Sequence, residues 1–359
     1  MQVSDGMNYA PKGKPAPVVK PGEFVFSAVR LDHGHIYGMC NGLTEAGGTL
    51  KYVYDPDPKK VEAFVKAFPS VTVARTEAEA LEDKETRLIA GAAVTSERCA
   101  LGLRAIAAGK DYFTDKAPLT TMEQLVAAKK ATAETGLKYM CYYGERLHNG
   151  GALFAQQLIE EGAIGRCVSV AGFGPHRLSA PSRPAWFFER EKFGGILCDI
   201  GSHQIEQYLT FCGEEDATVD CAHIANYNNP QYPEFEDFGD AVLTGKNGTN
   251  FYFRVDWFTP DGMRTWGDGR TLVIGTEGTI EIRKYINVGV EPFESDVVNL
   301  VNGKKEERYS VAGKVGYPYF GQLILDCLNR TETAMTQAHC FKAAELGVIA
   351  QDKAIRIYG

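Results

Sequence analysis

The N-terminal half of the chain alternates segments of strand character with segments of helix character, and this alternation constrains the fold more than any other feature. The pattern predicts strands over residues 24–29, 50–54, 86–90, 111–114 and 138–141, with helices over 35–46, 58–67, 97–108 and 122–135. The helices are inferred from side chains spaced for one helix face, such as Leu125, Lys129 and Thr132. Strands that alternate with helices form parallel sheets. We therefore predict an α/β fold in which residues 24–145 form a doubly wound parallel sheet.

The pattern changes after Arg146. A helix is predicted over 152–161, a strand over 167–173 and a further helix within 194–212. Residues 217–309 mostly alternate apolar and polar side chains as strands do, and two helices over 317–329 and 338–353 follow. Residues 146–359 are therefore predicted to form a second, α+β domain with a large, mostly antiparallel sheet.

Residues 1–23 are rich in Lys, Pro and Gly and contain no apolar stretch of the kind that a signal peptide needs. Two interpretations are open: a disordered tail, or an ordered arm that lies across a neighbouring subunit. Apolar side chains at Met7, Tyr9, Val18 and Val19 favour the arm, because they offer surface to bury.

The charge of the chain bears on its partners. A net charge of −8 argues against nucleic acid and anionic membranes, because phosphate groups require a basic surface. No apolar run approaches the roughly 18 residues that a transmembrane helix needs. Nine cysteines are scattered without a Cys-x-x-Cys pair or zinc-ligand spacing. We predict a cytoplasmic protein with reduced thiols and no metal site.

The turn Asp115-Lys116-Ala117-Pro118 follows a predicted strand. Residues just beyond the carboxyl end of a strand in a doubly wound sheet face the ligand crevice, and Pro118 stiffens the turn. Lys116 is therefore a candidate catalytic residue. The alternative is a solvated lysine in a surface turn.

Asp199 and His203 are spaced i, i+4 in a segment predicted to be helical, so one helix face would carry both. A carboxylate beside an imidazole orients the ring and raises its basicity, which suits a general base near neutral pH. Gly201 between them lowers helix propensity, which indicates that something approaches the backbone closely. The alternative is a surface helix with a solvated Asp and His. Cys198, beside Asp199, is interpreted as a small buried filler.

These two places resemble the hallmark motifs of the Gfo/Idh/MocA oxidoreductases, the family of glucose–fructose oxidoreductase and inositol 2-dehydrogenase. The family's Glu-Lys-Pro motif is similar to Asp115-Lys116-Ala117-Pro118, and its Gly-Gly-x-x-x-Asp-x-x-x-His motif is matched by Gly194, Gly195, Asp199 and His203. The resemblance runs from about residue 24 to the C-terminus. It includes Gly275-Thr276-Glu277-Gly278, which is similar to a glycine-bounded hairpin of the family's second domain.

The resemblance implies a Rossmann domain that binds a nicotinamide dinucleotide, followed by a domain for substrate binding and oligomerisation, in a dimer or tetramer. It also implies roles for three residues. His203 takes a hydroxyl proton, Asp199 orients His203 and binds a neighbouring substrate hydroxyl, and Lys116 stabilises the alkoxide beside the cofactor.

The turn after the first predicted strand departs from the family at the pyrophosphate. Glycines there usually let the backbone approach the phosphates at a helix N-terminus. Here the candidate cofactor-binding residues of the turn are Arg30, Asp32, His33, Gly34 and His35. The histidines are expected to donate hydrogen bonds to phosphate, and Arg30 to pair with phosphate or to neutralise Asp32. A degraded nucleotide pocket is the alternative.

Asp55 ends the second predicted strand, 21 residues after Gly34, where an acid binds the adenosine ribose diol in dinucleotide folds. An acid there disfavours a 2′-phosphate, so NAD is predicted over NADP, although Lys59 and Lys60 keep NADP open. Thr95 is also assigned to cofactor binding.

Substrate contacts are predicted in the loop before the Asp-His motif. His176, Arg183 and Trp186 offer rings that stack on a sugar and fixed donors for its hydroxyls. The alternative is that the aromatic side chains of this loop pack against the sheet.

Three classes of function remain open. The first is an NAD(P)-dependent oxidoreductase acting on a sugar, polyol or glycoside. The second is a redox-assisted glycosidase, or glycoside 3-dehydrogenase, whose tightly bound NAD is recycled. The third is a non-catalytic, sugar-sensing regulatory protein of the same fold. The presence of Lys116, Asp199 and His203 together argues against the third.

Overall fold

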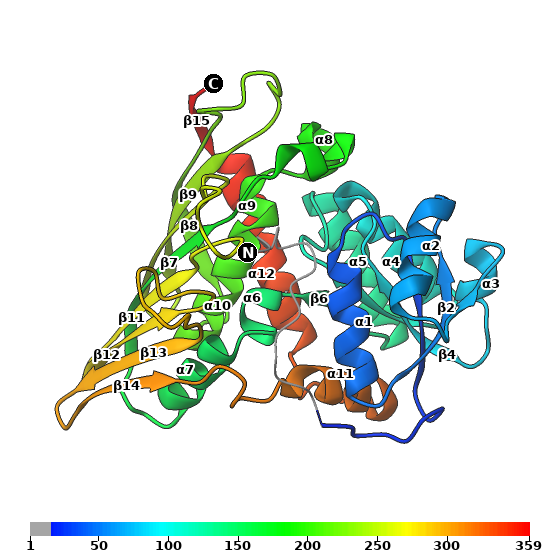
Figure 1. The fold of residues 1–359 in the computed structure, drawn as a ribbon, viewed down its shortest axis with the longest axis horizontal. Helices are drawn as coiled ribbons and strands as arrows, with labels where there is room; N and C mark the ends of the chain where they lie inside the picture. The colour runs from blue at the N-terminus through cyan, green and yellow to red at the C-terminus, as the bar shows by residue number, and fades with distance from the viewer. Residues whose placement is uncertain (1–15) are drawn as a thin grey trace.

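The computed structural model describes residues 16–359, which form two sheets (Figure 1). The first sheet is parallel, with strand order β3-β2-β1-β4-β5-β6. Its strands are β1 (Val25–Val29), β2 (Thr49–Tyr54), β3 (Thr72–Val73), β4 (Thr86–Gly91), β5 (Asp111–Asp115) and β6 (Tyr139–Tyr142). The order reverses between β1 and β4, and doubly wound sheets bind ligands beyond the carboxyl ends of the strands at such a point.

The helices of this half are α1 (His35–Glu45), α2 (Pro58–Ala67), α3 (Glu77–Leu81), α4 (Arg98–Ala107) and α5 (Met122–Thr135), with a 3₁₀ turn η1 (Thr95–Glu97) before α4. The α/β class and the parallel sheet are confirmed, and α2 and α5 begin and end at the predicted residues. The sequence pattern missed β3 and α3. They have two and five residues, too few to show a periodicity.

The second sheet has nine strands in the order β14-β13-β12-β11-β7-β10-β9-β8-β15. Neighbouring strands are antiparallel except for the pairs β7/β10 and β8/β15. The strands are β7 (Cys167–Pro175), β8 (Ala217–Ala225), β9 (Phe238–Gly245), β10 (Asn250–Asp256), β11 (Arg270–Gly275), β12 (Gly278–Arg283), β13 (Val297–Asn302), β14 (Glu306–Ser310) and β15 (Ile355–Tyr358). The mostly antiparallel sheet and the hairpin between Gly275 and Gly278 are confirmed. Strand β15 was not predicted.

The remaining helices are α6 (Gly144–Leu147), α7 (Gly150–Glu160), α8 (Arg190–Phe193), α9 (Ile196–Asp199), α10 (Gly201–Cys212), α11 (Pro318–Asn329) and α12 (Gln337–Lys353), with 3₁₀ turns η2 (Ala180–Ser182) and η3 (Ala185–Phe188). Helix α12 runs between the two sheets (Figure 1) and contacts α9, α10 and β8 on one side and α5 and β6 on the other. The C-terminal part of the chain therefore packs against both sheets.

The helix predicted within 194–212 is two helices, which meet at Ile200. Asp199 ends α9, and His203 lies in the first turn of α10. The backbone N–H of His203 donates to the carbonyl of Ile200 at 3.1 Å, a bond over three residues that tightens the turn. Gly201 meets the ring of Phe253, 3.1 Å from where a Cβ would lie, so the predicted close approach to its backbone is present.

The glycine pair before α9 is required by backbone geometry. Gly195 has φ 93° and ψ 155°, a combination that only glycine adopts without strain, and Gly194 has φ 88°. A Cβ on Gly195 would also collide with the Gln351 side chain of α12, and one on Gly194 with Thr120. The pair thus lets α9 approach both α12 and the turn before α5.

The N-terminal segment is described from residue 16. The N–H of Val18 donates to the carbonyl of Ala46 at 2.9 Å, and the Val18 side chain lies beside Gly321 of α11, so this part packs on its own chain. Met7 and Tyr9, on which the predicted arm partly rests, lie outside the described residues. No helix in residues 16–359 is long and apolar enough to cross a membrane. The nine cysteines are free, and Cys198 is buried as predicted.

We expect Gly195→Ala to lower the free energy of unfolding by about 3 kcal/mol, because alanine is strained in this backbone region and its Cβ meets Gln351. Gly213→Ala is the matched control. Gly213 also has a positive φ, 63°, but nothing lies within 4 Å of the added Cβ, so its loss should be about 1 kcal/mol. Urea denaturation measures both, and equal losses would contradict the role given to the Gln351 contact.

Candidate active site

The turn that carries Lys116 is held by a buried arginine that sequence analysis did not single out. Arg98, at the start of α4, is 1 % exposed. Its Nε donates to the carbonyl of Ala93 at 2.8 Å, and its terminal nitrogens donate to the carbonyls of Lys116 and Ala117 and to Asp115. One arginine in a helix gives no sequence signal, so only the structure reveals this clamp.

Lys116 forms a buried ion pair with Asp199. Lys116 Nζ donates to Asp199 Oδ1 at 2.6 Å, and both side chains are almost fully buried. Burial opposes ionisation of Asp199, but the Lys116 ammonium outweighs it and holds the pKa of this carboxyl below its ordinary value. The second oxygen of Asp199, Oδ2, is buried without a hydrogen-bond partner. It is therefore available to a ligand.

His203 lies in the same site and is neutral at physiological pH. It is 3 % exposed. Burial lowers its pKa to about 4, against the opposing effect of Glu145 and with the help of Lys116. Its Nδ1 has no hydrogen-bond partner. A neutral, buried imidazole with a free nitrogen can accept a proton from a ligand hydroxyl.

The expected contact between Asp199 and His203 is not seen. Among residues 16–359 the Asp199 carboxylate accepts its side-chain hydrogen bond from Lys116 rather than from His203. The carboxylate is held instead by Lys116, a residue just after β5 of the parallel sheet, which the spacing within one helix does not reveal. Asp199 acts on the imidazole only through its charge.

A second buried carboxylate lies in the site and was missed by sequence analysis. Glu145, in α6, is 4 % exposed, and its Oε2 accepts from Lys284 Nζ at 2.9 Å and from Gln204 Nε2 at 2.8 Å. Burial opposes its ionisation, but Lys284, His203 and His176 outweigh it and lower its pKa to about 2. The position of Glu145 in the sequence could have indicated it. Glu145 follows β6 as Lys116 follows β5, and the carboxyl ends of adjacent parallel strands lie at one edge of a sheet.

Of the three predicted substrate contacts, His176 lies closest to the catalytic residues. Its Nε2 is 3.9 Å from Glu145 Oε1, and its ring contacts those of Trp257 and Trp266. Burial lowers its pKa to about 3. Arg183 stacks over Trp257 and bonds the carbonyl of Leu178 at 2.8 Å, so it lies one ring away from His176.

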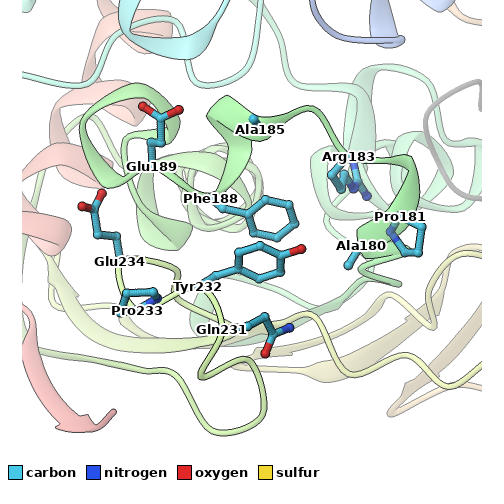
Figure 2. Close-up of a pocket in the computed structure, with 10 residues that line it drawn as sticks. All are labelled: Ala180, Pro181, Arg183, Ala185, Phe188, Glu189, Gln231, Tyr232, Pro233 and Glu234. Atoms are coloured by element: carbon cyan, nitrogen blue, oxygen red, sulfur yellow. The ribbon is translucent and has the colours of Figure 1, made fainter.

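Trp186 is not brought to the ion pair by any contact in the described residues. It lies in η3 beside Phe187, which packs on Phe193, Phe235 and Trp257. This part of the loop fits the alternative of aromatic packing. A separate cavity of about 560 Å³ lies beside the same loop, and the residues that line it include Phe188 and Tyr232, whose rings are stacked 3.7 Å apart (Figure 2).

The turn between β1 and α1 is held by ion pairs. Arg30, with φ 66°, pairs with Glu97 and lies 3.9 Å from Asp32. Lys60 Nζ approaches Asp32 more closely, at 2.6 Å, so this lysine balances the carboxylate that Arg30 was expected to neutralise. One oxygen of Asp32, Oδ2, is buried without a hydrogen-bond partner.

Asp55 holds the same turn from the end of β2. Its Oδ2 accepts from the backbone of Leu31 at 2.6 Å, and its Oδ1 accepts from that of Asp57 at 2.8 Å. The Asp55 side chain is 0 % exposed. Asp55 therefore supports the turn directly, and the ribose contact predicted for it stays a prediction.

His33 and His35 both contact Asp115, the residue before Lys116. Their Nδ1 atoms lie 3.0 Å and 2.8 Å from its two carboxylate oxygens, which also accept from Arg98 Nη2 and the backbone of Lys116. Asp115 is ionised, because Arg98 and the histidines outweigh burial and keep its pKa well below its usual range. Both histidines thus lie against a carboxylate, where contact with phosphate was predicted. Their rings lie near Lys116.

The β1–α1 region still fits a dinucleotide. Helix α1 begins at His35, after Gly34, and has no acid in its first turn, so an anion near this end meets the positive end of the helix dipole and no carboxylate of the helix. It starts between β1 and β4, where the strand order reverses. Thr95 is buried at the start of η1, just beyond β4. The predicted cofactor residues therefore line one edge of the parallel sheet.

Comparisons with known proteins agree with this arrangement. The model of the GFO/IDH/MocA C-terminal domain matches residues 153–281. The scyllo-inositol 2-dehydrogenase (NAD(+)) of Bacillus subtilis is 28% identical over 258 residues, which cover 70% of this chain and 71% of that protein. The D-xylose dehydrogenase of Paenarthrobacter nicotinovorans is 29% identical over 128 residues, 34% of this chain. The chain spans about a third, 33%, of that relative's length.

A crystal structure from Erwinia carotovora atroseptica is 49% identical and superposes with a TM-score of 0.91. It covers 93% of this chain, and the match takes in 100% of that protein, which is assigned to the oxidoreductases without a named substrate. The two sheets are therefore arranged as in a solved relative that matches over its whole length.

The buried histidines predict a pH dependence of stability. The pKa values of His203 and His176, about 4 and about 3, lie below the roughly 6.5 of an unfolded chain. Between the folded and unfolded pKa values, the unfolded chain binds more protons than the folded one. The contribution of each histidine to the free energy of unfolding is therefore complete above a pH of about 6.5 and is lost as the pH falls toward 4.

We expect the free energy of unfolding to fall by about 1.4 kcal/mol per pH unit for each of these histidines in that window. Urea denaturation between neutral and mildly acidic pH measures the slope, and His203→Gln should reduce it by one histidine's share. An unchanged slope in the variant would contradict the neutral, buried state of His203.

Proposed function

This chain belongs to the Gfo/Idh/MocA oxidoreductase family, and on that premise we propose that it is an NAD(P)-dependent dehydrogenase acting on a hydroxyl-bearing carbon of a sugar or polyol. Its relatives include dehydrogenases named for inositol and xylose. The observation that carries the proposal is a neutral His203 buried in one site with the Lys116–Asp199 ion pair.

A bound nicotinamide dinucleotide supplies an acceptor for the hydride that leaves the substrate carbon. The residues of the chain handle the proton and the charge. His203 accepts the hydroxyl proton, and Lys116 stabilises the negative charge that develops on that oxygen. The free Oδ2 of Asp199 accepts a hydrogen bond from a neighbouring hydroxyl of the substrate. Lys116 is already ordered by Asp199 and by the Arg98 clamp, so no reorganisation is needed as the charge forms.

The same edge of the sheet holds the cofactor in this proposal. The pyrophosphate would be held near the N-terminus of α1, with Arg30, His33, His35 and Thr95 on the turns that flank it. NAD is favoured over NADP because the turn carries two carboxylates, Asp32 and Asp55, that repel a 2′-phosphate. Lys60 is engaged with these carboxylates.

His203→Asn is expected to lower kcat by about 10²- to 10⁴-fold, because it removes the proton acceptor. Binding of NAD, measured by calorimetry, should be unchanged. His223→Asn, a half-buried histidine of β8 paired with Asp240, is the control and should keep full activity. Calorimetry that detects no binding of NAD or NADP at millimolar concentration would overturn the proposal, and so would full kcat in His203→Asn.

We also propose that the protein is a cytoplasmic homo-oligomer, with residues 24–145 and 146–359 as its cofactor and substrate domains. Large apolar side chains of the nine-stranded sheet are exposed, among them Leu272, Ile274 and Val301 at 43%, 47% and 46%, which favours a partner on this face.

Leu272→Asp with Ile274→Asp is expected to shift the molar mass from light scattering to that of a monomer, because two carboxylates oppose burial of this face. Val126→Asp is the matched control, since Val126 is 64% exposed on α5, away from the sheet. A wild-type monomer would contradict the proposal.

A further inference from the structure

Glu145 is a second buried carboxylate in the site, beside Asp199, and it has no part in the proton transfer to His203. Glu145 follows β6, whose neighbour β5 carries Lys116, and Asp115 is paired with Tyr142 across the two strands. Both residues therefore project from the same edge of the sheet. The second domain reaches Glu145 with Lys284, just after β12, and with Gln204 of α10.

Glu145 carries a full negative charge that the fold has no stability reason to keep. Lys284 is 0 % exposed, so the Glu145–Lys284 pair is a desolvated ion pair. Replacing such a pair with apolar side chains of similar volume is often neutral or stabilising. Its presence beside the proton acceptor therefore favours a role in binding or chemistry.

One oxygen of Glu145 is held and the other is not. Oε2 accepts from Lys284 and Gln204, whereas Oε1 is buried without a hydrogen-bond partner and lies 3.9 Å from His176 Nε2. A buried carboxylate oxygen without a donor is costly unless a ligand supplies one. Asp199 Oδ2 is in the same condition. The site thus presents two acceptor-only atoms, which a ligand satisfies by donating two O–H groups.

The charges of the site also favour a neutral ligand that carries hydroxyl groups. Lys116 is paired with Asp199, and Lys284 is paired with Glu145. A substrate carboxylate in this site would be repelled by the negative charges of Asp199 and Glu145. The two lysines are already paired with these carboxylates and offer it little compensation. Neutral hydroxyls meet oxygens that lack donors.

We propose that Glu145 is a specificity-determining residue. Its Oε1 accepts a hydrogen bond from a hydroxyl of the substrate, and its charge selects uncharged polyhydroxylated substrates over sugar acids. This assignment rests on the proposed function, because it concerns the substrate of the same site.

The test compares two sugars that differ by one carboxylate, glucose and glucuronate, in the wild type and in Glu145→Gln. Binding is measured by calorimetry with NAD present, and kcat/KM is measured with NAD. The wild type is expected to favour glucose by about 100-fold, and Glu145→Gln to lower this preference at least about tenfold, because the amide keeps an acceptor oxygen but loses the charge. Glu161→Gln, an exposed carboxylate at the end of α7, is the control and should leave the preference unchanged.

A second readout separates this role from a purely structural one. The Glu145 charge raises the pKa of His203, so the acid limb of the pH profile of kcat/KM should move to lower pH in Glu145→Gln. A merely destabilised variant would lose activity without this shift.

The outcomes distinguish the two proposals. Turnover of glucose and glucuronate at equal rates, or a preference that Glu145→Gln leaves unchanged, overturns the role of Glu145 while the dehydrogenase stands. Selective binding of glucose without any turnover supports the role of Glu145 and overturns the dehydrogenase. Binding and turnover of neither sugar overturn both.

Discussion

The buried ion pair between Lys116 and Asp199 is the interaction on which the rest of this structure depends. Lys116 stands at the end of a strand of the parallel sheet, and Asp199 stands at the end of α9, which packs against the other half of the molecule. Neither charge is tolerated alone at this depth, because removing one partner of a buried pair leaves an uncompensated charge. The two halves must therefore meet at this point for the pair to form. The same contact places the ammonium beside the neutral imidazole of His203.

The Glu145–Lys284 pair repeats this arrangement a short way along the same edge. It joins the turn after β6 to the end of β12, and it is as deeply buried as the first pair. Between them, the two pairs leave two carboxylate oxygens and one imidazole nitrogen without protein partners. The two lysines thus hold the site together, and the acceptor atoms that remain without a partner are left for a ligand. This distribution explains both a proton acceptor that is neutral at physiological pH and the affinity that we infer for hydroxyl groups.

The turn between β1 and α1 is held together without the glycines that dinucleotide-binding turns usually carry. Asp55 accepts from the backbone of Leu31, Lys60 balances Asp32, and the two histidines are tied to Asp115. Side-chain bonds thus hold a turn that glycines would otherwise allow to form by close approach. The histidines consequently contact the residue next to Lys116 in the chain. They connect the turn between β1 and α1 to the turn after β5.

Local sequence by itself determined the longer strands and helices, the α/β class and the selection of Lys116, Asp199 and His203, because periodicity and the residues at strand ends are properties of short segments. It missed the short elements β3 and α3 and the final strand β15. It did not reveal Arg98, Glu145 or Lys284, and it misjudged the partner of Asp199. Each of these depends on residues far apart in the chain, such as the 139 positions between Glu145 and Lys284. Which charges pair, and which oxygens remain free for a ligand, was decided only when the two sheets packed together, because desolvation and pairing act between neighbours in space rather than in sequence.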